Sequence, residues 1–176
     1  MKSALLVVDC LNDFLDLAGA LNCGASGRAV IPAIAREIAQ ARQGGEPVIY
    51  ACDAHRPDDA EFALFPPHCL AGGWGAEVVP ELRPEPGERV LPKRRFSAFF
   101  GTDLDLALRE GGVEALRIVG VCTNICVLYT TADARMRGYE VTVPADAVAS
   151  FDPDAHRFAL GQLRDVLKAK VEGTGE

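Results

Sequence analysis

Ile118-Val-Gly-Val-Cys-Thr-Asn-Ile-Cys126 joins an apolar strand to an amphipathic helix. Residues 115–121 are largely apolar and β-branched, which is typical of a buried strand. Thr123 is a favourable N-cap, residues 124–137 carry apolar side chains at helical spacing, and Gly138 ends the pattern. The apolar stripe of this predicted helix consists of Ile125, Leu128, Ala132 and Met136. The stretch therefore predicts a β-strand that runs directly into a capped α-helix.

Cys126 falls in the first turn of that helix if Thr123 is the N-cap. Unpaired backbone N–H groups and the positive end of the helix dipole meet in this turn. They lower the pKa of a thiol and stabilise an oxyanion, which makes Cys126 a candidate nucleophile with an expected pKa below that of a free cysteine. The alternative is that Cys126 is a small buried side chain that packs the helix against the sheet.

The composition is that of a small, apolar and acidic protein. The chain has 176 residues, so a single domain spanning 1–176 is expected. A net charge of −7 gives no electrostatic reason to expect binding to nucleic acid. The apolar run at 3–9 is too short for a signal peptide or a membrane span, so no membrane partner is expected.

Cysteines without an export signal predict reduced thiols and a cytoplasmic protein. No second pair of cysteines accompanies Cys122 and Cys126 at zinc-finger spacing, so a structural zinc–thiolate site is not expected. The six cysteines are Cys10, Cys23, Cys52, Cys69, Cys122 and Cys126.

Strand-like and helix-like patterns alternate along the chain. Strands are expected at 3–9, 47–52, 88–92, 115–121 and 139–144, and helices at 28–42, 102–110, 124–137 and 153–171. Thr102 and Asp152 are expected to cap the second and last helices, and residues 172–176 to fray. The last helix is expected to turn Phe158, Leu160, Leu163 and Leu167 inward. The alternation predicts a three-layer α/β/α fold with a mostly parallel central sheet.

Three polar residues stand where such a sheet builds active sites. Asp9 ends the first strand, Lys93 follows the third, and Cys126 opens a helix. The carboxyl ends of neighbouring parallel strands meet at one edge of the sheet. There Asp9 can accept the thiol proton, and the ammonium of Lys93 can stabilise the thiolate and hold the carboxylate. Taken singly, Lys93 also fits a solvated surface lysine, and Asp9 a cap or a structural ion pair.

The segment from 53 to 86 has no periodicity and is rich in Pro, Gly, His and acidic residues. Long loops inside a compact domain are usually functional or disordered, and the histidines and aromatics here favour function. Asp53 and His55 lie two residues apart and His68 follows, a set that can bind zinc, manganese or iron. The alternative is that both histidines only satisfy backbone groups of the loop.

Four segments resemble the isochorismatase-like cysteine hydrolases, the superfamily of nicotinamidases and related amidohydrolases. They occur in the family's order and span nearly the whole chain. They are Leu5-Leu-Val-Val-Asp-Cys-Leu-Asn-Asp-Phe14, Lys93-Arg-Arg-Phe-Ser-Ala-Phe-Phe-Gly-Thr-Asp-Leu104, Gly120-Val-Cys-Thr-Asn-Ile-Cys-Val127 and Tyr139-Glu-Val-Thr-Val-Pro-Ala-Asp-Ala147. One departure is Leu11, where many members have glutamine.

This resemblance implies a catalytic triad of Asp9, Lys93 and Cys126. It also implies an oxyanion hole formed by the backbone amides of Cys122 and Cys126. A cis peptide bond between Val121 and Cys122 would orient the first of these amides. The implied fold is the isochorismatase-like α/β fold.

The resemblance extends to a metal site in the loop. The implied ligands of a divalent metal, expected to be zinc, are Asp53, His55 and His68, with Glu61 as a candidate fourth. In nicotinamidases the metal binds the pyridine nitrogen and two aromatic side chains hold the ring; here these are Phe14 and Phe65. Nicotinamidases more usually have tryptophan at the position of Phe65, which leaves the substrate open. Trp74 is expected to pack the loop, and His156 to be structural or exposed.

The predicted activity is hydrolysis of a small carboxamide through a thioester, with release of ammonia. Cys126 attacks the carbonyl, and Asp9 delivers a proton to the leaving ammonia and then activates water. One alternative is an isochorismatase-type vinyl-ether hydrolase, in which the cysteine is not required, and another is a non-catalytic binding module. A redox role for Cys122 and Cys126 needs their sulfur atoms within bridging distance.

A small-molecule amide and further copies of the chain are the expected partners. The family habit is self-association, and the aromatic-rich segment 96–100 offers apolar surface beyond what the core needs. A homodimer or a larger homo-oligomer is therefore expected.

Overall fold

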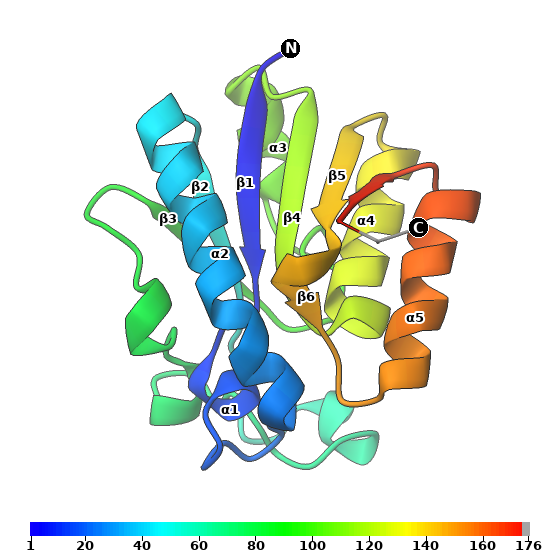
Figure 1. The fold of residues 1–176 in the computed structure, drawn as a ribbon. Helices are drawn as coiled ribbons and strands as arrows, with labels where there is room; N and C mark the ends of the chain where they lie inside the picture. Colours follow the sequence, from blue (N-terminus) through cyan, green and yellow to red (C-terminus); the bar gives the residue numbers. More distant parts are fainter. Residues whose placement is uncertain (174–176) are drawn as a thin grey trace.

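The computed structural model describes residues 1–173 as three layers built on a seven-stranded sheet (Figure 1). The strands are β1 (Ser3–Val8), β2 (Val48–Asp53), β3 (Arg89–Lys93), β4 (Ala115–Val121), β5 (Glu140–Pro144), β6 (Val148–Ala149) and β7 (Lys170–Glu172). They pair in the order β3-β2-β1-β4-β5-β7, β6 pairs with β4, and all these pairings are parallel. The predicted α/β/α fold with a parallel sheet is therefore confirmed.

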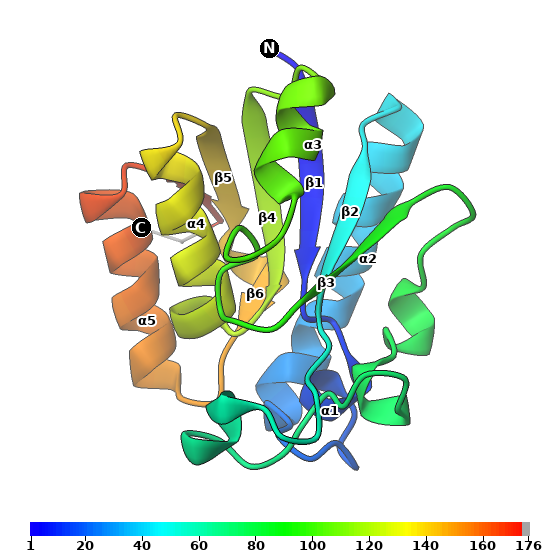
Figure 2. The same cartoon turned by 180° about the vertical axis from the view of Figure 1, so that it is seen from behind.

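Helices cover both faces of the sheet. Among residues 1–173 they are α1 (Asn12–Leu15), α2 (Gly24–Gly44), α3 (Leu104–Glu110), α4 (Leu128–Met136) and α5 (Pro153–Gly161). α2 lies on one face, and α3, α4 and α5 lie on the other (Figure 1 and Figure 2). Successive side chains of β1 alternate between two cores: Leu5 and Val7 pack towards α2, and Leu6 and Val8 towards α3 and α4. None of the helices described has the length and apolarity to cross a membrane.

The carboxyl ends of the central strands meet at the lower edge of the sheet in Figure 1, beside α1 and the loop after β2. Gly120 allows β4 to approach β1 there, because an ideal Cβ on it would lie 1.9 Å from the carbonyl oxygen of Val8. Gly120 also has a φ of +117°, which an L-residue with a side chain rarely adopts. Directly after β1, Asp9 has a φ of +50° at the turn out of the strand. This local geometry puts Asp9 at the edge of the sheet.

The first long helix begins earlier than predicted. α2 starts at Gly24, four residues before the expected start at Arg28, and it continues through Pro32. The added first turn contains Gly24, Ser26 and Gly27, which are weak helix formers, so local propensity underestimates it. The turn is held by its position next to α1, which the sequence also did not predict.

The last helix, predicted over 153–171, is helical only as far as Val166. α5 ends at Gly161, and Gln162–Val166 form a π-helical turn. Lys168 then adopts a φ of +54°, which ends the helical path, and β7 adds to the sheet beside β5. The backbone groups of β7 are therefore satisfied by a distant strand, and a local apolar period cannot reveal that pairing.

The side chains of this region also differ from expectation. Leu160 and Leu163 are buried and Leu167 packs partly against the core, as predicted, but Phe158 is 65% exposed. Glu172, expected to fray, lies in β7 and its carboxylate is 2.8 Å from a guanidinium nitrogen of Arg117. Gly173 follows β7 with a φ of +77°, and residues 174–176 of the segment expected to fray lie outside the described residues.

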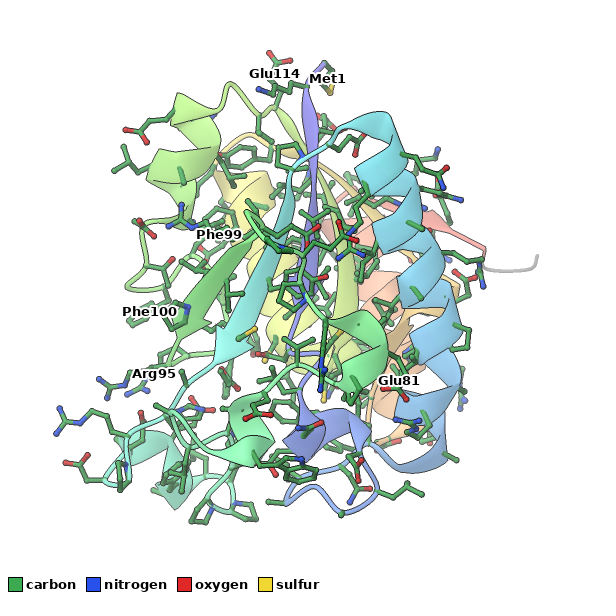
Figure 3. All side chains as sticks on the ribbon, turned by 90° about the vertical axis from the view of Figure 1, so that its left-hand side faces the viewer. Met1, Glu81, Arg95, Phe99, Phe100 and Glu114 are labelled. Atoms are coloured by element: carbon green, nitrogen blue, oxygen red, sulfur yellow. The ribbon has the colours of Figure 1, made fainter. Side chains whose placement is uncertain are left out.

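The segment between β3 and α3 is less exposed than predicted. Ala98 and Phe99 belong to the core, whereas Phe100 is exposed and lies at the outer edge of the molecule (Figure 3). α3 begins at Leu104, and Asp103 holds the N-cap position without a hydrogen bond from its side chain. The Thr102 hydroxyl, one residue earlier than Asp103, accepts from the backbone N–H of Leu104 at 3.3 Å and donates to the carbonyl oxygen of Ala98 at 2.6 Å.

Candidate active site

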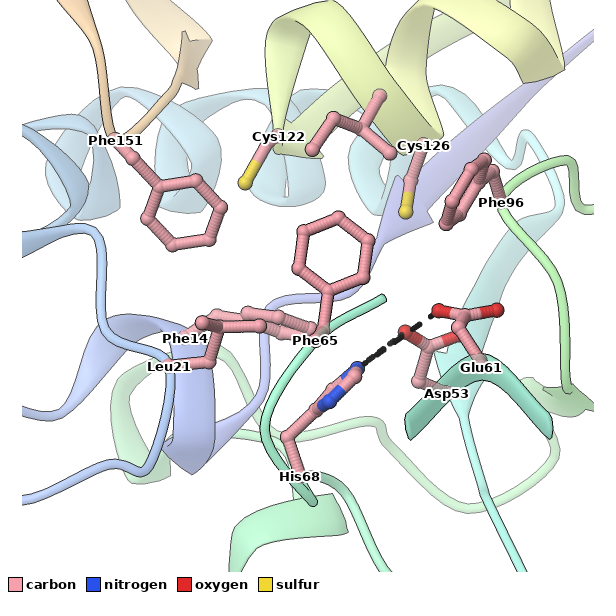
Figure 4. Close-up of a pocket in the computed structure, with 11 residues that line it drawn as sticks. Phe14, Leu21, Asp53, Glu61, Phe65, His68, Phe96, Cys122, Cys126 and Phe151 are labelled. Atoms are coloured by element: carbon pink, nitrogen blue, oxygen red, sulfur yellow. Dashed lines mark ion pairs between the residues drawn. The ribbon is translucent and has the colours of Figure 1, made fainter. Parts of the chain in front are cut away.

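A pocket opens at the carboxyl edge of the sheet, between α1, the loop after β2 and the turn after β4 (Figure 4). The sulfur atoms of Cys122 and Cys126 point into it from one side, and His68, Asp53 and Glu61 approach from the other. Its walls are mainly aromatic and aliphatic. The lining residues are Phe14, Leu21, Asp53, Glu61, Phe65, His68, Phe96, Cys122, Ile125, Cys126 and Phe151.

Asp9, Lys93 and Cys126 come together beside this pocket. The Nζ atom of Lys93 lies 2.8 Å from Oδ2 of Asp9 and 3.6 Å from Sγ of Cys126. All three side chains are buried, and Lys93 is only 1% exposed, so it is not a solvated surface lysine. The ends of β1 and β3 and the turn after β4 supply one residue each, which agrees with the geometric expectation from the sequence.

Two further contacts hold Lys93. Its ammonium donates to Oδ1 of Asp53 at 2.6 Å and to the carbonyl oxygen of Arg95 at 3.1 Å. Burial alone would lower the pKa of Lys93, but the negative charges of Asp53 and Asp9 outweigh burial and raise it well above its usual value. Lys93 therefore stays positively charged. The contact with Asp53 was not predicted, because the sequence assigned Asp53 only to the metal site.

Asp9 is buried but remains ionisable near neutral pH. Its Oδ1 atom accepts a hydrogen bond from the backbone N–H of Asp53 at 2.8 Å. Burial and the negative charge of Asp53 raise the pKa of Asp9 to about 6, against the opposing attraction of Lys93. A carboxylate with such a pKa is mostly ionised at pH 7 and still basic enough to accept a proton.

Cys126 lies in a π-helical turn, Thr123–Val127, and not in the first turn of a Thr123-capped α-helix. Cys122 occupies the cap position, and the Thr123 hydroxyl lies 2.8 Å from Nδ1 of His156. Burial and the negative charges of Asp9 and Asp53 outweigh Lys93 and raise the pKa of Cys126 well above its usual value. The expected lowering of the Cys126 pKa is therefore wrong, and the resting side chain is a thiol.

The π-helical turn also explains why the predicted apolar stripe of the next helix is displaced. Ile125 and Leu128 of the predicted stripe pack partly against the core, whereas Met136 is 76% exposed. A π turn contains an extra residue, which rotates the following helix relative to a regular α-helical period. The side chains that are buried are Val127, Thr130, Thr131 and Ala134.

The peptide bond between Val121 and Cys122 is cis, as the resemblance implies. Cys122 and Cys126 both line the pocket, so their backbones stand next to the space for a substrate. In residues 1–173 all six cysteines are free. The sulfur atom in contact with Cys122 is that of Cys23, 3.6 Å away, so the geometry gives no support to a redox pairing of Cys122 with Cys126.

Asp53, His55, Glu61 and His68 form a buried cluster beside the triad. One donor atom from each lies within 4.8 Å of the others. The Nε2 atom of His55 is 3.6 Å from Oδ2 of Asp53 and 3.8 Å from Oε1 of Glu61, and Nε2 of His68 is 3.8 and 4.0 Å from the same two oxygens. These separations are too long for hydrogen bonds but suit donors arranged around one cation.

The surroundings of the two imidazoles fit metal binding through Nε2. Nδ1 of His68 lies 2.7 Å from the carbonyl oxygen of Pro66, which can only accept, so Nδ1 carries the proton and Nε2 is free to bind. Nε2 of His55 and Oε2 of Glu61 are buried without a hydrogen bond, and Nδ1 of His55 faces the Asp59 carboxylate, 3.2 Å away but outside hydrogen-bond geometry. Such buried atoms are rare unless another group satisfies them. Two nitrogens with carboxylate oxygens are a donor set for zinc and similar divalent ions, so these residues fit the implied metal.

The aromatic lining contains both predicted side chains, Phe14 and Phe65. It also contains Phe96 and Phe151, which were not predicted to line it. Phe96 follows Lys93 by three residues and could have been found from that proximity. Phe151 follows β6, a two-residue strand too short to give a periodic signal, so nothing in the sequence pointed to it.

Trp74 and His156 lie outside the pocket lining. Trp74 is 50% exposed, and its carbonyl oxygen accepts a hydrogen bond from the side chain of Asn12 at 2.8 Å. It therefore packs the loop only in part. His156 is partly buried on α5, and its Nδ1 atom contacts the hydroxyl of Thr123, the first residue of the turn that carries Cys126. Its predicted structural role agrees with this position.

Comparisons with known proteins agree with this geometry. The family model for the isochorismatase domain matches residues 3–173. A crystal structure of nicotinamidase PncA from Bacillus subtilis is 38% identical, with a TM-score of 0.94 over 98% of this chain and 100% of that chain. N-carbamoylsarcosine amidase from Thermoplasma acidophilum is 37% identical, with a TM-score of 0.89 over 100% of this chain and 98% of that chain. Pyrazinamidase of Pyrococcus horikoshii in complex with zinc is 30% identical, with a TM-score of 0.90 over 97% of this chain and 98% of that chain. The family model spans nearly the whole chain and these relatives align with it over nearly their full length, so the chain belongs to the isochorismatase family.

Proposed function

We propose that this isochorismatase-family hydrolase is a cysteine-dependent amidohydrolase that cleaves a neutral aromatic carboxamide of the nicotinamide type. The observation that carries the proposal is the contact of the Cys126 thiol with a buried ion pair, Lys93 and Asp9. A thiol, a base and a cation in one buried group are the parts that acyl transfer needs. The similarity to nicotinamidase PncA from Bacillus subtilis supports the same chemistry.

Acylation begins with the thiol of Cys126 because its pKa is raised. As Sγ bonds to the carboxamide carbon, the thiol proton passes to Asp9, whose pKa of about 6 suits this transfer. The carbonyl π pair moves to oxygen, and the backbone amides of Cys122 and Cys126 stabilise the oxyanion. Collapse of the intermediate breaks the C–N bond, Asp9 returns its proton to the leaving nitrogen, and ammonia departs from a thioester.

Deacylation uses the same residues. Asp9, again ionised, takes a proton from water while the water oxygen attacks the thioester carbon. Collapse of the second oxyanion expels the Cys126 sulfur, which regains the proton held by Asp9. The product is a carboxylic acid, and Lys93 remains protonated throughout because two carboxylates raise its pKa.

The metal would be held by Asp53, His55 and His68, with Glu61 as the fourth ligand, and zinc is the expected ion. When bound, it supplies a Lewis acid that can bind a ring nitrogen of the substrate. The residues of the chain then orient the ring, with Phe14 against His68 and Phe65 against Phe96 in edge-to-face contacts. The zinc complex of Pyrococcus horikoshii pyrazinamidase supports this assignment.

The pocket favours a neutral substrate over a carboxylate. Its lining has four phenylalanines and the acidic side chains of Asp53 and Glu61, and it includes no Arg or Lys. A substrate carboxylate would therefore find no arginine or lysine among the lining side chains, and the charge of the proposed metal is already offset by Asp53 and Glu61. This argues against an anionic substrate such as N-carbamoylsarcosine, although N-carbamoylsarcosine amidase from Thermoplasma acidophilum has the same fold.

A screen for ammonia release tests the proposal. Purified, zinc-supplemented protein is expected to hydrolyse nicotinamide and pyrazinamide much faster than N-carbamoylsarcosine or aliphatic amides. Preference for the carboxylate substrate would contradict the substrate proposal. Turnover of isochorismate without release of ammonia from any amide would favour the vinyl-ether alternative instead.

A further inference from the structure

A second carboxylate stands behind the proposed metal site. Asp59 precedes the short 3₁₀ helix Ala60–Ala63 and its side chain is fully buried. Its Oδ2 atom lies 3.2 Å from Nδ1 of His55, on the side of the ring opposite to Asp53 and Glu61. No sequence pattern distinguished Asp59 from its neighbour Asp58, which is exposed.

Asp59 is fixed by contacts on its other sides. Its carboxylate accepts from the backbone N–H of Glu61 at 3.1 Å, from Nε of Arg94 at 3.0 Å and from a terminal guanidinium nitrogen of Arg95 at 2.9 Å. Two guanidinium groups balance one carboxylate, so Asp59 can be buried as an anion. The charge and the position of the acceptor facing His55 are therefore both set before any metal binds.

The two imidazoles of the cluster are supported in the same way. The Pro66 carbonyl accepts from Nδ1 of His68 and leaves Nε2 free. Asp59 offers an acceptor to Nδ1 of His55, which leaves Nε2 of His55 facing Asp53 and Glu61. A neutral imidazole has one N–H, so an acceptor at Nδ1 selects the tautomer whose Nε2 lone pair can bind a metal.

We propose that Asp59 is a positioning residue that holds His55 in the Nδ1-protonated tautomer and so sets the metal affinity of the site. Supporting groups of this kind typically change metal affinity by about 10- to 100-fold when they are removed. The inference rests on the proposed metal site. It adds that the carboxylate of Asp59, held by Arg94 and Arg95, determines how tightly the site binds the metal.

The same contacts connect the metal loop with the triad. Arg95, which holds Asp59, also accepts through its carbonyl oxygen from the ammonium of Lys93. Arg94 and Arg95 directly follow Lys93 in the chain. A disturbance of Asp59 is therefore expected to weaken metal binding first, and to affect Lys93 only through this indirect connection.

The test measures zinc affinity by competition with a chromophoric chelator on metal-free protein. Asp59→Ala is expected to weaken zinc binding by about 10- to 100-fold. Asp59→Asn keeps an acceptor for Nδ1 and is expected to lose less, and it serves as the informative variant if the alanine variant does not fold. Asp58→Ala is the matched control, because Asp58 is exposed and pairs only with Arg56 among the ion pairs of the described chain. Its affinity is expected to stay within about twofold of the parent.

Nitrogen-15 NMR of the His55 ring in metal-free protein gives a second readout that a general loss of stability would not move. The parent is expected to show a single tautomer protonated at Nδ1, and Asp59→Ala a mixture or the opposite tautomer. Equal zinc affinity and an unchanged tautomer in Asp59→Ala would overturn the proposal. If the parent binds no zinc, the proposed metal site fails, and the NMR comparison alone decides the role of Asp59. If Asp59→Ala binds zinc more weakly but the parent has no amidase activity, the role of Asp59 is supported and the proposed reaction is refuted.

Discussion

Burial raises the pKa of both Asp9 and Cys126, with different consequences for the two side chains. It raises the pKa of Asp9 to about 6, where a carboxylate becomes an effective base, and it keeps Cys126 protonated until attack. Lys93 counters burial at both groups with one positive charge. In the proposed mechanism, the thiol proton of Cys126 therefore passes to Asp9 during the reaction, and no thiolate is formed beforehand.

The pKa of Asp9 predicts an acid limb in the pH profile of kcat/KM. Asp9 must be ionised to accept the thiol proton, so lowering the pH through about 6 removes the active form. Below that pH the rate should fall about tenfold per unit. The rate should begin to fall at a higher pH than it would with an ordinary aspartate, because the pKa of Asp9 in the folded protein is raised. The acid limb is measured from steady-state rates of ammonia release between pH 4.5 and 8, taken at intervals of about one pH unit. A profile that stays flat down to about pH 4.5 would exclude Asp9 as the base.

Asp9→Asn should abolish the base while keeping the local fold. Asparagine tolerates positive φ, and its side-chain oxygen can still accept from the N–H of Asp53. Lys93 keeps Asp53 as an ionic partner. Turnover should fall by about 10²- to 10⁴-fold, the usual contribution of a general base, with little change in the melting temperature. Asp16→Asn, at a half-buried site outside the pocket lining, is the control. Activity of Asp9→Asn close to that of the control would remove Asp9 from the mechanism.

The sequence identified the residues of the site better than their chemical states. Asp9, Lys93 and Cys126 could be found because strand ends and a helix start mark them locally. The pKa of Cys126 was predicted in the wrong direction because it depends on burial among Asp9 and Asp53, which are distant in sequence. Asp59 was missed for a related reason, since only the fold brings its carboxylate to His55.

At the scale of elements, the contact between β1 and β4 sets the positions of Asp9 and Cys126. Val8 and Gly120 are aligned in this parallel pair, one residue before Asp9 and six before Cys126. The backbone of Val8 fills the space where a side chain on Gly120 would lie. The close approach of these strands is therefore a condition for the triad.

Gly120→Ala tests this condition. An added Cβ would lie 1.9 Å from the Val8 carbonyl oxygen, so backbone must shift, and the φ of +117° adds strain. The free energy of unfolding should fall by about 3 kcal/mol or more. Gly87→Ala is the matched control, because Gly87 also has a positive φ, +94°, but no atom within 4 Å of its Cβ position. Its cost should be about 1 kcal/mol. Equal losses for the two variants in urea unfolding would show that strand contact is not the determinant.

The ends of elements were harder to predict than their order. Alternation of strands and helices gave the parallel three-layer fold, because that pattern depends on local apolar periods. α2 was predicted too short because tertiary contacts stabilise its glycine-rich first turn. β6 and β7 were missed because strands of two and three residues exist only through pairing with β4 and β5.

At the scale of the whole molecule, a groove with exposed aromatic side chains lies next to the active site. It runs between the segment after β3 and α4, and Phe100, Tyr129 and Met136 in it are exposed. Phe100 and Arg95 lie at the outer edge of the molecule in Figure 3. We expect this groove to be the surface through which the chain self-associates, since exposed apolar patches on soluble proteins are commonly contacts.

Light scattering coupled to size exclusion tests self-association. The parent should have a mass above that of the monomer, and Phe100→Asp should shift it towards the monomer because a charge is costly in an apolar contact. Leu106→Asp is the control, since Leu106 is similarly exposed and does not line the groove. A parent protein that is monomeric over a wide range of concentrations would refute this expectation.

The central claim is that Cys126 forms a covalent bond with the substrate. Rapid quenching during turnover of nicotinamide, followed by mass spectrometry of the intact protein and its peptides, measures this most directly. We expect an acyl group on the peptide that contains Cys126, transfer of that acyl group to hydroxylamine as a free hydroxamic acid when hydroxylamine is present, and neither adduct nor turnover in Cys126→Ala. Hydrolysis by Cys126→Ala at the parent's rate, with no acyl adduct on Cys126 in the parent, would contradict it.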